Sequence, residues 1–96
     1  MKPSLVLASH REAIKHIVRS HRGTNARIFG STALGTDTES SDLDLLIDPA
    51  PGMTLFDIGA IRHELLELLG VPVDVVTPKA LPEKFRASVL ANAIPI

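Results

Sequence analysis

The sequence predicts an α/β (α+β) fold, with a small mixed sheet of three strands and helices on one of its faces. Apolar runs of strand length alternate along the chain with longer segments whose apolar residues recur at helical spacing. In one apolar run Asp42 and Asp44 alternate with leucines, so that strand has an acidic face and an apolar face. The apolar faces pack against helices, and the acidic face stays open.

The first helix and strand come before a turn. Ser9-x-x-Glu12 is a capping-box pattern, which predicts a helix that begins at or before Ser9. Gly23 is expected to end this helix, because glycine is common just beyond helix ends. A short strand is then expected over residues 26–29, directly before Gly30.

Gly30 and Ser31 have the composition of a phosphate-binding turn. Gly30 has no Cβ, so the backbone there can turn sharply and approach a ligand closely. Ser31 is expected to cap a short helix over residues 32–35 and to offer its hydroxyl and N–H to a phosphate oxygen. Gly35 would end that helix.

Two carboxylates share one face of the next strand, predicted over residues 42–47. The Cα atoms of Asp42 and Asp44 should lie about 6.5 Å apart, since a strand rises about 3.3 Å per residue. Like charges this close destabilise each other unless something neutralises them. A pair of divalent metal ions about 3.5–4 Å apart fits this spacing. Asp37 and Glu39, in the preceding polar loop, are expected to be ordinary loop acids.

A helix and a third strand follow a proline-rich connector. Thr54-x-x-Asp57 resembles a helix cap, so Asp57 is explained as a helix-start acid. The expected apolar stripe of this helix is Leu55, Ile58, Ile61, Leu65 and Leu69. Pro72 suggests that the strand over residues 71–76 lies at an edge or begins there. Asp74, inside its β-branched run, needs a partner if it faces a core.

The last predicted element is a helix that opens near Pro82, a residue favoured in a first helical turn. Phe85, Val89 and Leu90 are expected to pack this helix down, and Pro95 to stop it.

Gly30-Ser31, ten intervening residues and then Asp42-x-Asp44 resemble the signature of the DNA polymerase β-like nucleotidyltransferase superfamily. Within it the chain resembles the minimal nucleotidyltransferase (MNT) antitoxins of HEPN/MNT toxin–antitoxin pairs. The resemblance covers nearly the whole chain, from about residue 10 to the end. It also implies that Asp74 is the third carboxylate, because the family has one on this strand.

The resemblance implies a function and a set of ligands. Asp42, Asp44 and Asp74 would be the catalytic residues and the ligands of two Mg²⁺ ions, with Mn²⁺ as an alternative, since these metals prefer oxygen ligands. Gly30 and Ser31 would bind the nucleotide. The expected reaction transfers AMP from ATP to a hydroxyl of a partner HEPN-domain toxin, which neutralises the toxin.

Length and composition predict the number of domains, the kind of partner and the location of the protein. At 96 residues with a net charge of −1 and no basic run, the chain predicts one domain over residues 1–96 and no direct nucleic-acid partner. It has no cysteine, hence no disulfide framework. Its first apolar run is too short for a signal peptide or a membrane span, so we expect a cytoplasmic protein that forms a hetero-oligomer with its toxin.

Two alternatives stay open at this stage. The family commonly has Arg where this chain has Leu34, and an apolar side chain cannot contact a phosphate. The protein would then be a non-catalytic antitoxin that neutralises the toxin by binding alone. A transferase acting on a small molecule such as an aminoglycoside is less favoured, because the usual acceptor-binding helical domain is missing from the sequence.

Overall fold

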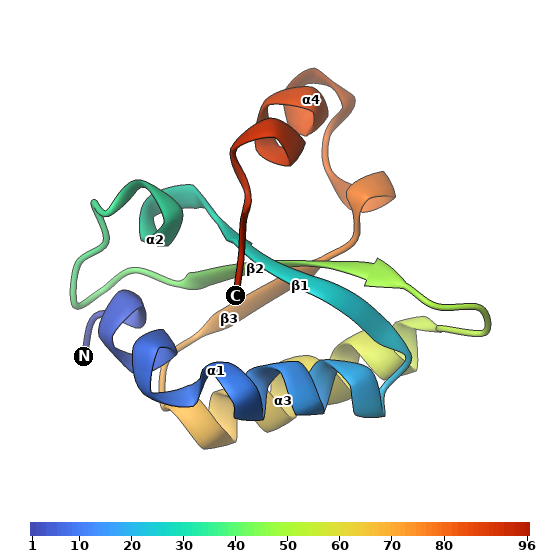
Figure 1. The fold of residues 1–96 in the computed structure, drawn as a ribbon, viewed down its shortest axis with the longest axis horizontal. Coiled ribbons are helices and arrows are strands. Elements are labelled where there is room, and N and C mark those ends of the chain that lie inside the picture. The colour runs from blue at the N-terminus through green and yellow to red at the C-terminus, as the bar shows by residue number, and fades with distance from the viewer.

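The computed structural model describes residues 1–96, which form four α-helices, a short 3₁₀ helix and a four-stranded sheet (Figure 1). The helices are α1 (Pro3–Ser20), α2 (Gly30–Leu34), α3 (Leu55–Leu69) and α4 (Glu83–Asn92), with the 3₁₀ helix η1 at Pro78–Ala80. The strands are β1 (Gly23–Phe29), β2 (Leu43–Pro49), β3 (Val73–Val76) and β4 (Ile94–Pro95). None of these helices has the length and apolar character needed to cross a membrane.

The sheet is mixed, as predicted, with the strand order β3-β2-β1-β4. β1 runs antiparallel to β2 and β4, whereas β2 and β3 are parallel. The prediction of three strands was wrong by one, because Ile94 and Pro95 extend along β1 opposite Ile28 and Arg27. Pro95 therefore lies in an edge strand, which has another strand on only one side. The N–H that proline lacks is not needed on the open side.

The core lies between the sheet and the two long helices, α1 and α3, which cover one face (Figure 1). Leu43, Leu45 and Ile47 of β2 are completely buried, as their alternation with the aspartates predicts. In α3 the buried residues are Ile61, Leu65 and Leu69.

Leu55 was wrongly predicted to belong to the buried stripe of α3, since 84% of it is exposed. It lies six residues before Ile61, which places it about a third of a turn away from the buried face. The predicted cap at the start of α3 is confirmed. Thr54 and Asp57 form a capping box, in which the Asp57 carboxylate accepts the backbone N–H of Thr54 at 2.9 Å.

The prediction of helices on one face of the sheet was wrong for α4 and η1, which lie on the other side of the sheet from α1 and α3 (Figure 1). The prediction that Phe85, Val89 and Leu90 pack α4 down was wrong, because no residue of α4 is buried. Hydrogen bonds hold this helix instead. The guanidinium of Arg86 donates to the backbone carbonyls of Pro78, Lys79 and Leu81 at 2.9–3.2 Å.

The N-terminal helix begins earlier than its capping pattern required, at Pro3, and the helix is kinked at His10, whose backbone is non-helical. It ends at Ser20, and Gly23 opens β1 rather than ending the helix. Lys2, at the N-cap position, makes no side-chain cap bond.

The interpretation of Asp37 as an ordinary loop acid was wrong, because only 7% of this residue is exposed. Its carboxylate accepts the backbone N–H of Ser4, in the first turn of α1, at 2.9 Å. A carboxylate at a helix N-terminus is favourable because it meets free N–H groups and the positive end of the helix dipole. Glu39 is exposed, as predicted, and pairs with the N-terminal amine at 3.0 Å.

Because of Asp37, the stability of the protein should decrease as the pH is lowered into the acid range. The hydrogen bond from Ser4 holds the pKa of the Asp37 carboxyl below its ordinary value of 3.8, although burial opposes this effect. The stabilisation is therefore present above that value and is lost as the pH falls through the lowered pKa of the folded state. Urea unfolding at pH 7 should show wild type more stable than Asp37→Asn, with the difference shrinking at pH 3. A difference that does not change with pH would contradict this assignment.

Candidate active site

The parallel pairing of β2 and β3 brings two of the predicted carboxylates together. Asp44 and Asp74 are direct partners in the register of these strands. The Cα atoms of neighbouring strands lie about 4.8 Å apart, and paired residues point to the same face. Since Leu43 and Leu45 face the core, Asp44 and Asp74 both lie on the opposite face, the side of α4.

The third carboxylate, Asp42, directly precedes β2 and lies two residues before Asp44. Asp42 and Asp74 are exposed, whereas Asp44 is half-buried. Burial raises the pKa of the Asp44 carboxyl above its ordinary value, and the negative charges of Asp74 and Asp42 raise it further. The negative charges of Asp42 and Asp74 therefore both act on the carboxyl of Asp44.

Excess negative charge at Asp44 fits a cation site, because Mg²⁺ and Mn²⁺ are hard ions that prefer carboxylate oxygens. The side chains themselves are spread out, and no group of three or more His, Cys, Asp or Glu residues is close enough together to hold a metal ion. A bound cation would have to draw the carboxylates of Asp42, Asp44 and Asp74 toward one another. Their assignment as metal ligands therefore stays a prediction.

Gly30 lies directly against Asp44. Phe29, the residue before it, is the register partner of Asp44 on β1. Gly30 has a φ of +69°, which L side chains rarely adopt, and a Cβ at this position would overlap the Asp44 carboxylate. Glycine is therefore required here twice, for the backbone conformation and for the space beside Asp44. Gly30 of the predicted phosphate turn and Asp44 of the predicted metal ligands are therefore in direct contact.

Comparison with known proteins identifies the family. The model of the family described as "Nucleotidyltransferase domain" matches residues 7–96. The chain belongs to this family. Nucleotidyl transfer is accordingly the enzyme class of the protein, as the Gly-Ser and Asp-x-Asp spacing predicts.

Individual relatives agree with this assignment. A candidate protein adenylyltransferase of Methanocaldococcus jannaschii is 34% identical over 80 residues, covering 83% of this chain and 86% of the relative. The solved structure of a candidate minimal nucleotidyltransferase superposes with a TM-score of 0.87 and 40% identity, covering 97% of this chain and 95% of that one. The crystal structure of a toxin–antitoxin with AMP-PNP shares the fold, with a TM-score of 0.74 and 20% identity over 88% of this chain and 69% of that one. The predicted minimal nucleotidyltransferase fold is confirmed.

Ser31 takes a different place in this nucleotidyltransferase from the one predicted. α2 begins at Gly30, so Ser31 lies within its first turn, and Phe29 occupies the N-cap position without any side-chain cap bond. The prediction that Ser31 caps this helix was therefore wrong. Its N–H is among the first-turn groups that have no partner within a helix, so it can still donate to a ligand. Gly35 ends α2 with a φ of +74°, as predicted.

The two glycines that flank α2 allow a matched test of the site. Gly30→Ala and Gly35→Ala should each destabilise the fold by about 1–2 kcal/mol through their positive φ, and Gly30→Ala by more, because its Cβ would also displace the Asp44 carboxylate. Only Gly30→Ala should also weaken ATP binding, since a Cβ at Gly35 meets no atom within 4 Å whereas one at Gly30 meets Asp44. Urea unfolding and calorimetry with ATP would measure the two effects. Equal ATP affinities for the two variants would contradict the assigned role of Gly30.

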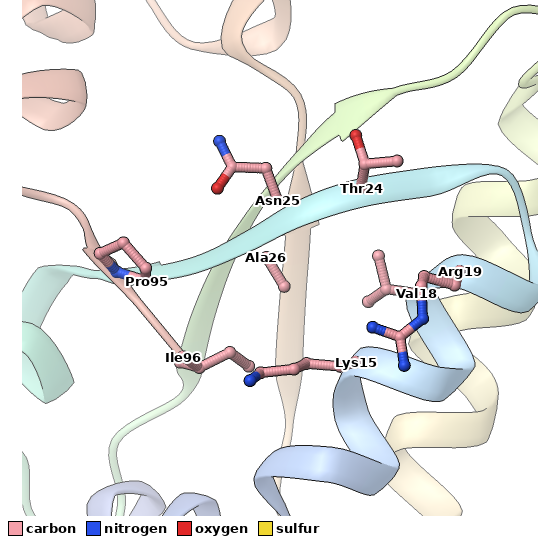
Figure 2. Close-up of a pocket in the computed structure, with 8 residues that line it drawn as sticks. All are labelled: Lys15, Val18, Arg19, Thr24, Asn25, Ala26, Pro95 and Ile96. Atoms are coloured by element: carbon pink, nitrogen blue, oxygen red, sulfur yellow. The ribbon is translucent and has the colours of Figure 1, made fainter.

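A pocket of about 230 Å³ lies elsewhere, between α1, β1 and the C-terminal segment (Figure 2). Lys15 and Arg19 of α1, Asn25 of β1 and Ile96 are among the residues that line it. None of the five predicted site residues does so. No acidic residue lines this pocket, so the carboxylates of Asp42, Asp44 and Asp74 remain the candidate active site.

Sequence reasoning missed the hydrogen bond that the Ser4 N–H of α1 donates to the carboxylate of Asp37, in the loop between Ser31 and Asp42. An acid in a polar loop has no periodicity that would reveal its burial. One signal was available in the N-terminal residues. α1 starts after Lys2, which cannot cap a helix, so its first N–H groups need an acceptor from elsewhere in the chain.

Proposed function

We propose that this nucleotidyltransferase transfers AMP from ATP to a hydroxyl of a partner toxin with a HEPN domain, in a Mg²⁺-dependent reaction that neutralises the toxin. One observation carries this proposal. Asp44 lies opposite Asp74 and against Gly30, so acidic groups and a sharply turned backbone meet at a single place. Such an arrangement suits a triphosphate with its metal ions.

Each residue of the site has a role in this reaction. Asp42 and Asp44 would hold the metal ions, of which Asp74 would bind one, and Mn²⁺ would serve in place of Mg²⁺. Bound metal would supply charge stabilisation at the reacting phosphate. Gly30 and the first-turn N–H of Ser31 would bind phosphate oxygens of ATP.

The transfer itself is an in-line displacement. The acceptor hydroxyl oxygen forms a bond to the α-phosphorus of ATP, and the bond from that phosphorus to the β-phosphate oxygen breaks, which releases pyrophosphate. The hydroxyl proton passes to a base. Asp74 is suited to take it, because it is exposed on the same face as Asp44 and therefore accessible to an incoming acceptor.

Exposed apolar side chains support a protein as the acceptor. Leu34 on α2 is 74% exposed, and Phe85 on α4 is 54% exposed. α4 lies on the side of the sheet opposite α1 and α3 (Figure 1), which is also the side of Asp44 and Asp74, and α2 directly follows β1 beside Asp44. Exposed apolar groups of this kind often contact another protein, whereas a polar sugar would gain little from them.

Radiolabelled ATP tests the type of transfer. With a HEPN-domain toxin as the acceptor, label from the α-phosphate should appear on the toxin, and label from the γ-phosphate should not. Transfer of γ-label instead would mean phosphoryl transfer and would overturn the proposal.

Exposed Leu34 also favours a second candidate, an antitoxin that acts by binding alone. In the position where the family commonly has Arg, this side chain projects into solvent and cannot contact a phosphate. The protein would then cover the toxin without modifying it. The two candidates differ in whether the toxin gains mass.

A further inference from the structure

The loop between α2 and β2 is tied to α1 by one buried charge. Asp37 is 7% exposed, and its carboxylate accepts the backbone N–H of Ser4 at 2.9 Å. Charged side chains are seldom buried without such a partner. Lys2 provides no cap for α1, and Pro3 has no N–H, so Ser4 is the first residue of the helix that can donate. The loop therefore supplies the cap that α1 lacks.

Hydrogen-bonded turns flank Asp37 on both sides. Before it, the N–H of Thr36 donates to the carbonyl of Ser31 at 3.0 Å. After it, the N–H of Ser41 donates to the carbonyl of Thr38 at 3.1 Å, and the N–H of Thr38 donates to the Ser41 hydroxyl at 2.8 Å. Asp37 is thus the single residue between a turn that contains Ser31 and a turn that ends at Ser41.

From these contacts we infer that Asp37 is a positioning residue, which fixes Ser31 and Asp42 relative to each other by anchoring their shared loop to α1. Asp42 directly follows Ser41, so both ends of the anchored segment lie in the proposed site. Asp37 is buried against α1 and acts through the two turns. The inference rests on the proposed function, because it assigns the anchored residues to phosphate and metal binding.

The anchor matters because phosphate and metal ligands must be held in place before the substrate binds. An unanchored loop would sample many conformations, and binding would have to restrict them at a cost in free energy. Displacements of about 1 Å in a reacting group can lower rates by as much as about 10²-fold. Loss of the anchor should therefore weaken ATP binding and slow transfer even in molecules that remain folded.

Calorimetry of the full chain with ATP and Mn²⁺ tests the inference. Asp37→Ala should bind ATP on the order of tenfold more weakly than wild type. Asp37→Asn keeps an oxygen that can accept the Ser4 N–H, so its affinity should fall between the two. Glu39→Ala removes an exposed acid from the same loop and should bind ATP as wild type does.

A second control separates positioning from loss of stability. Val6→Ala creates a cavity beneath the start of α1, where Val6 is buried, and leaves the hydrogen bonds of the loop unchanged. All variants are measured at a temperature at which circular dichroism shows them folded. Weaker ATP binding in Asp37→Ala but not in Val6→Ala supports positioning. Equal affinities in Asp37→Ala and wild type, or equal losses in Asp37→Ala and Val6→Ala, would overturn it. Wild type that fails to bind ATP with Mn²⁺ would instead overturn the proposed function.

Discussion

Asp44→Asn is expected to lower kcat for nucleotidyl transfer by a factor of about 10²–10³, the range seen when one group that stabilises a transition state is removed. Asp44 lies opposite Asp74 and against Gly30, so the change removes charge from the centre of the site. Asparagine has nearly the same shape as aspartate, and the fold should be kept. The rate at which α-phosphate label reaches the toxin, at saturating Mg²⁺, measures the effect.

Asp48→Asn is the matched control for this experiment. Asp48 lies on the same strand four residues further on, and its carboxylate pairs with Arg27 rather than with the site. Its loss should reduce stability somewhat while transfer continues at close to the wild-type rate. Equal rates for Asp44→Asn and Asp48→Asn would remove Asp44 from the catalytic site.

Asp44→Asn should also stabilise the protein when metal is absent. The pKa of Asp44 is raised in the folded state by burial and by the charges of Asp74 and Asp42. The protonated Asp44 carboxyl costs the folded state least below the pKa that it has in the unfolded chain. Stability is lost as the pH rises through the raised pKa of Asp44 in the folded state. At pH 7 the wild type carries this full unfavourable contribution. With EDTA, Asp44→Asn should therefore melt at a higher temperature than wild type.

Metal should reverse this order. A divalent ion at ten times its dissociation constant stabilises the state that binds it by about 1.4 kcal/mol. In a domain of this size that corresponds to a rise of about 5–10 °C in melting temperature. Wild type should show such a rise with Mg²⁺ or Mn²⁺, and the double variant Asp42→Asn with Asp44→Asn should not. A rise that persists in the double variant would show that the metal binds elsewhere.

Local rules were enough to predict the backbone geometry around the candidate site residues. Alternation along a strand placed Asp42 and Asp44 opposite the buried leucines, and the β-branched run around Asp74 predicted a strand. Positive φ at Gly30 and Gly35 agrees with the turns that their positions predicted. These properties depend on a few neighbouring residues, so sequence alone reveals them.

Features that depend on distant contacts could not be read in this way. Ile94 and Pro95 form a strand because the edge of β1 is available beside them, and this edge lies more than sixty residues earlier in the chain. α4 contains Phe85, Val89 and Leu90, which suggested packing, yet none of its residues is buried and Arg86 ties the helix to the carbonyls around η1. The pairing of Asp37 with Ser4 spans 33 residues in sequence, and nothing in the loop around Asp37 indicates it.

The intact mass of the toxin tests the central claim most directly. None of the 96 residues is tyrosine, so a tyrosine acceptor must belong to the partner protein. After incubation with this protein, ATP and Mg²⁺, the toxin should gain the mass of one or a few AMP groups. It should gain none with Asp42→Asn, and that variant should fail to rescue growth of cells that express the toxin. An unchanged toxin mass together with full rescue by Asp42→Asn would contradict nucleotidyl transfer and identify the protein as an antitoxin that acts by binding alone.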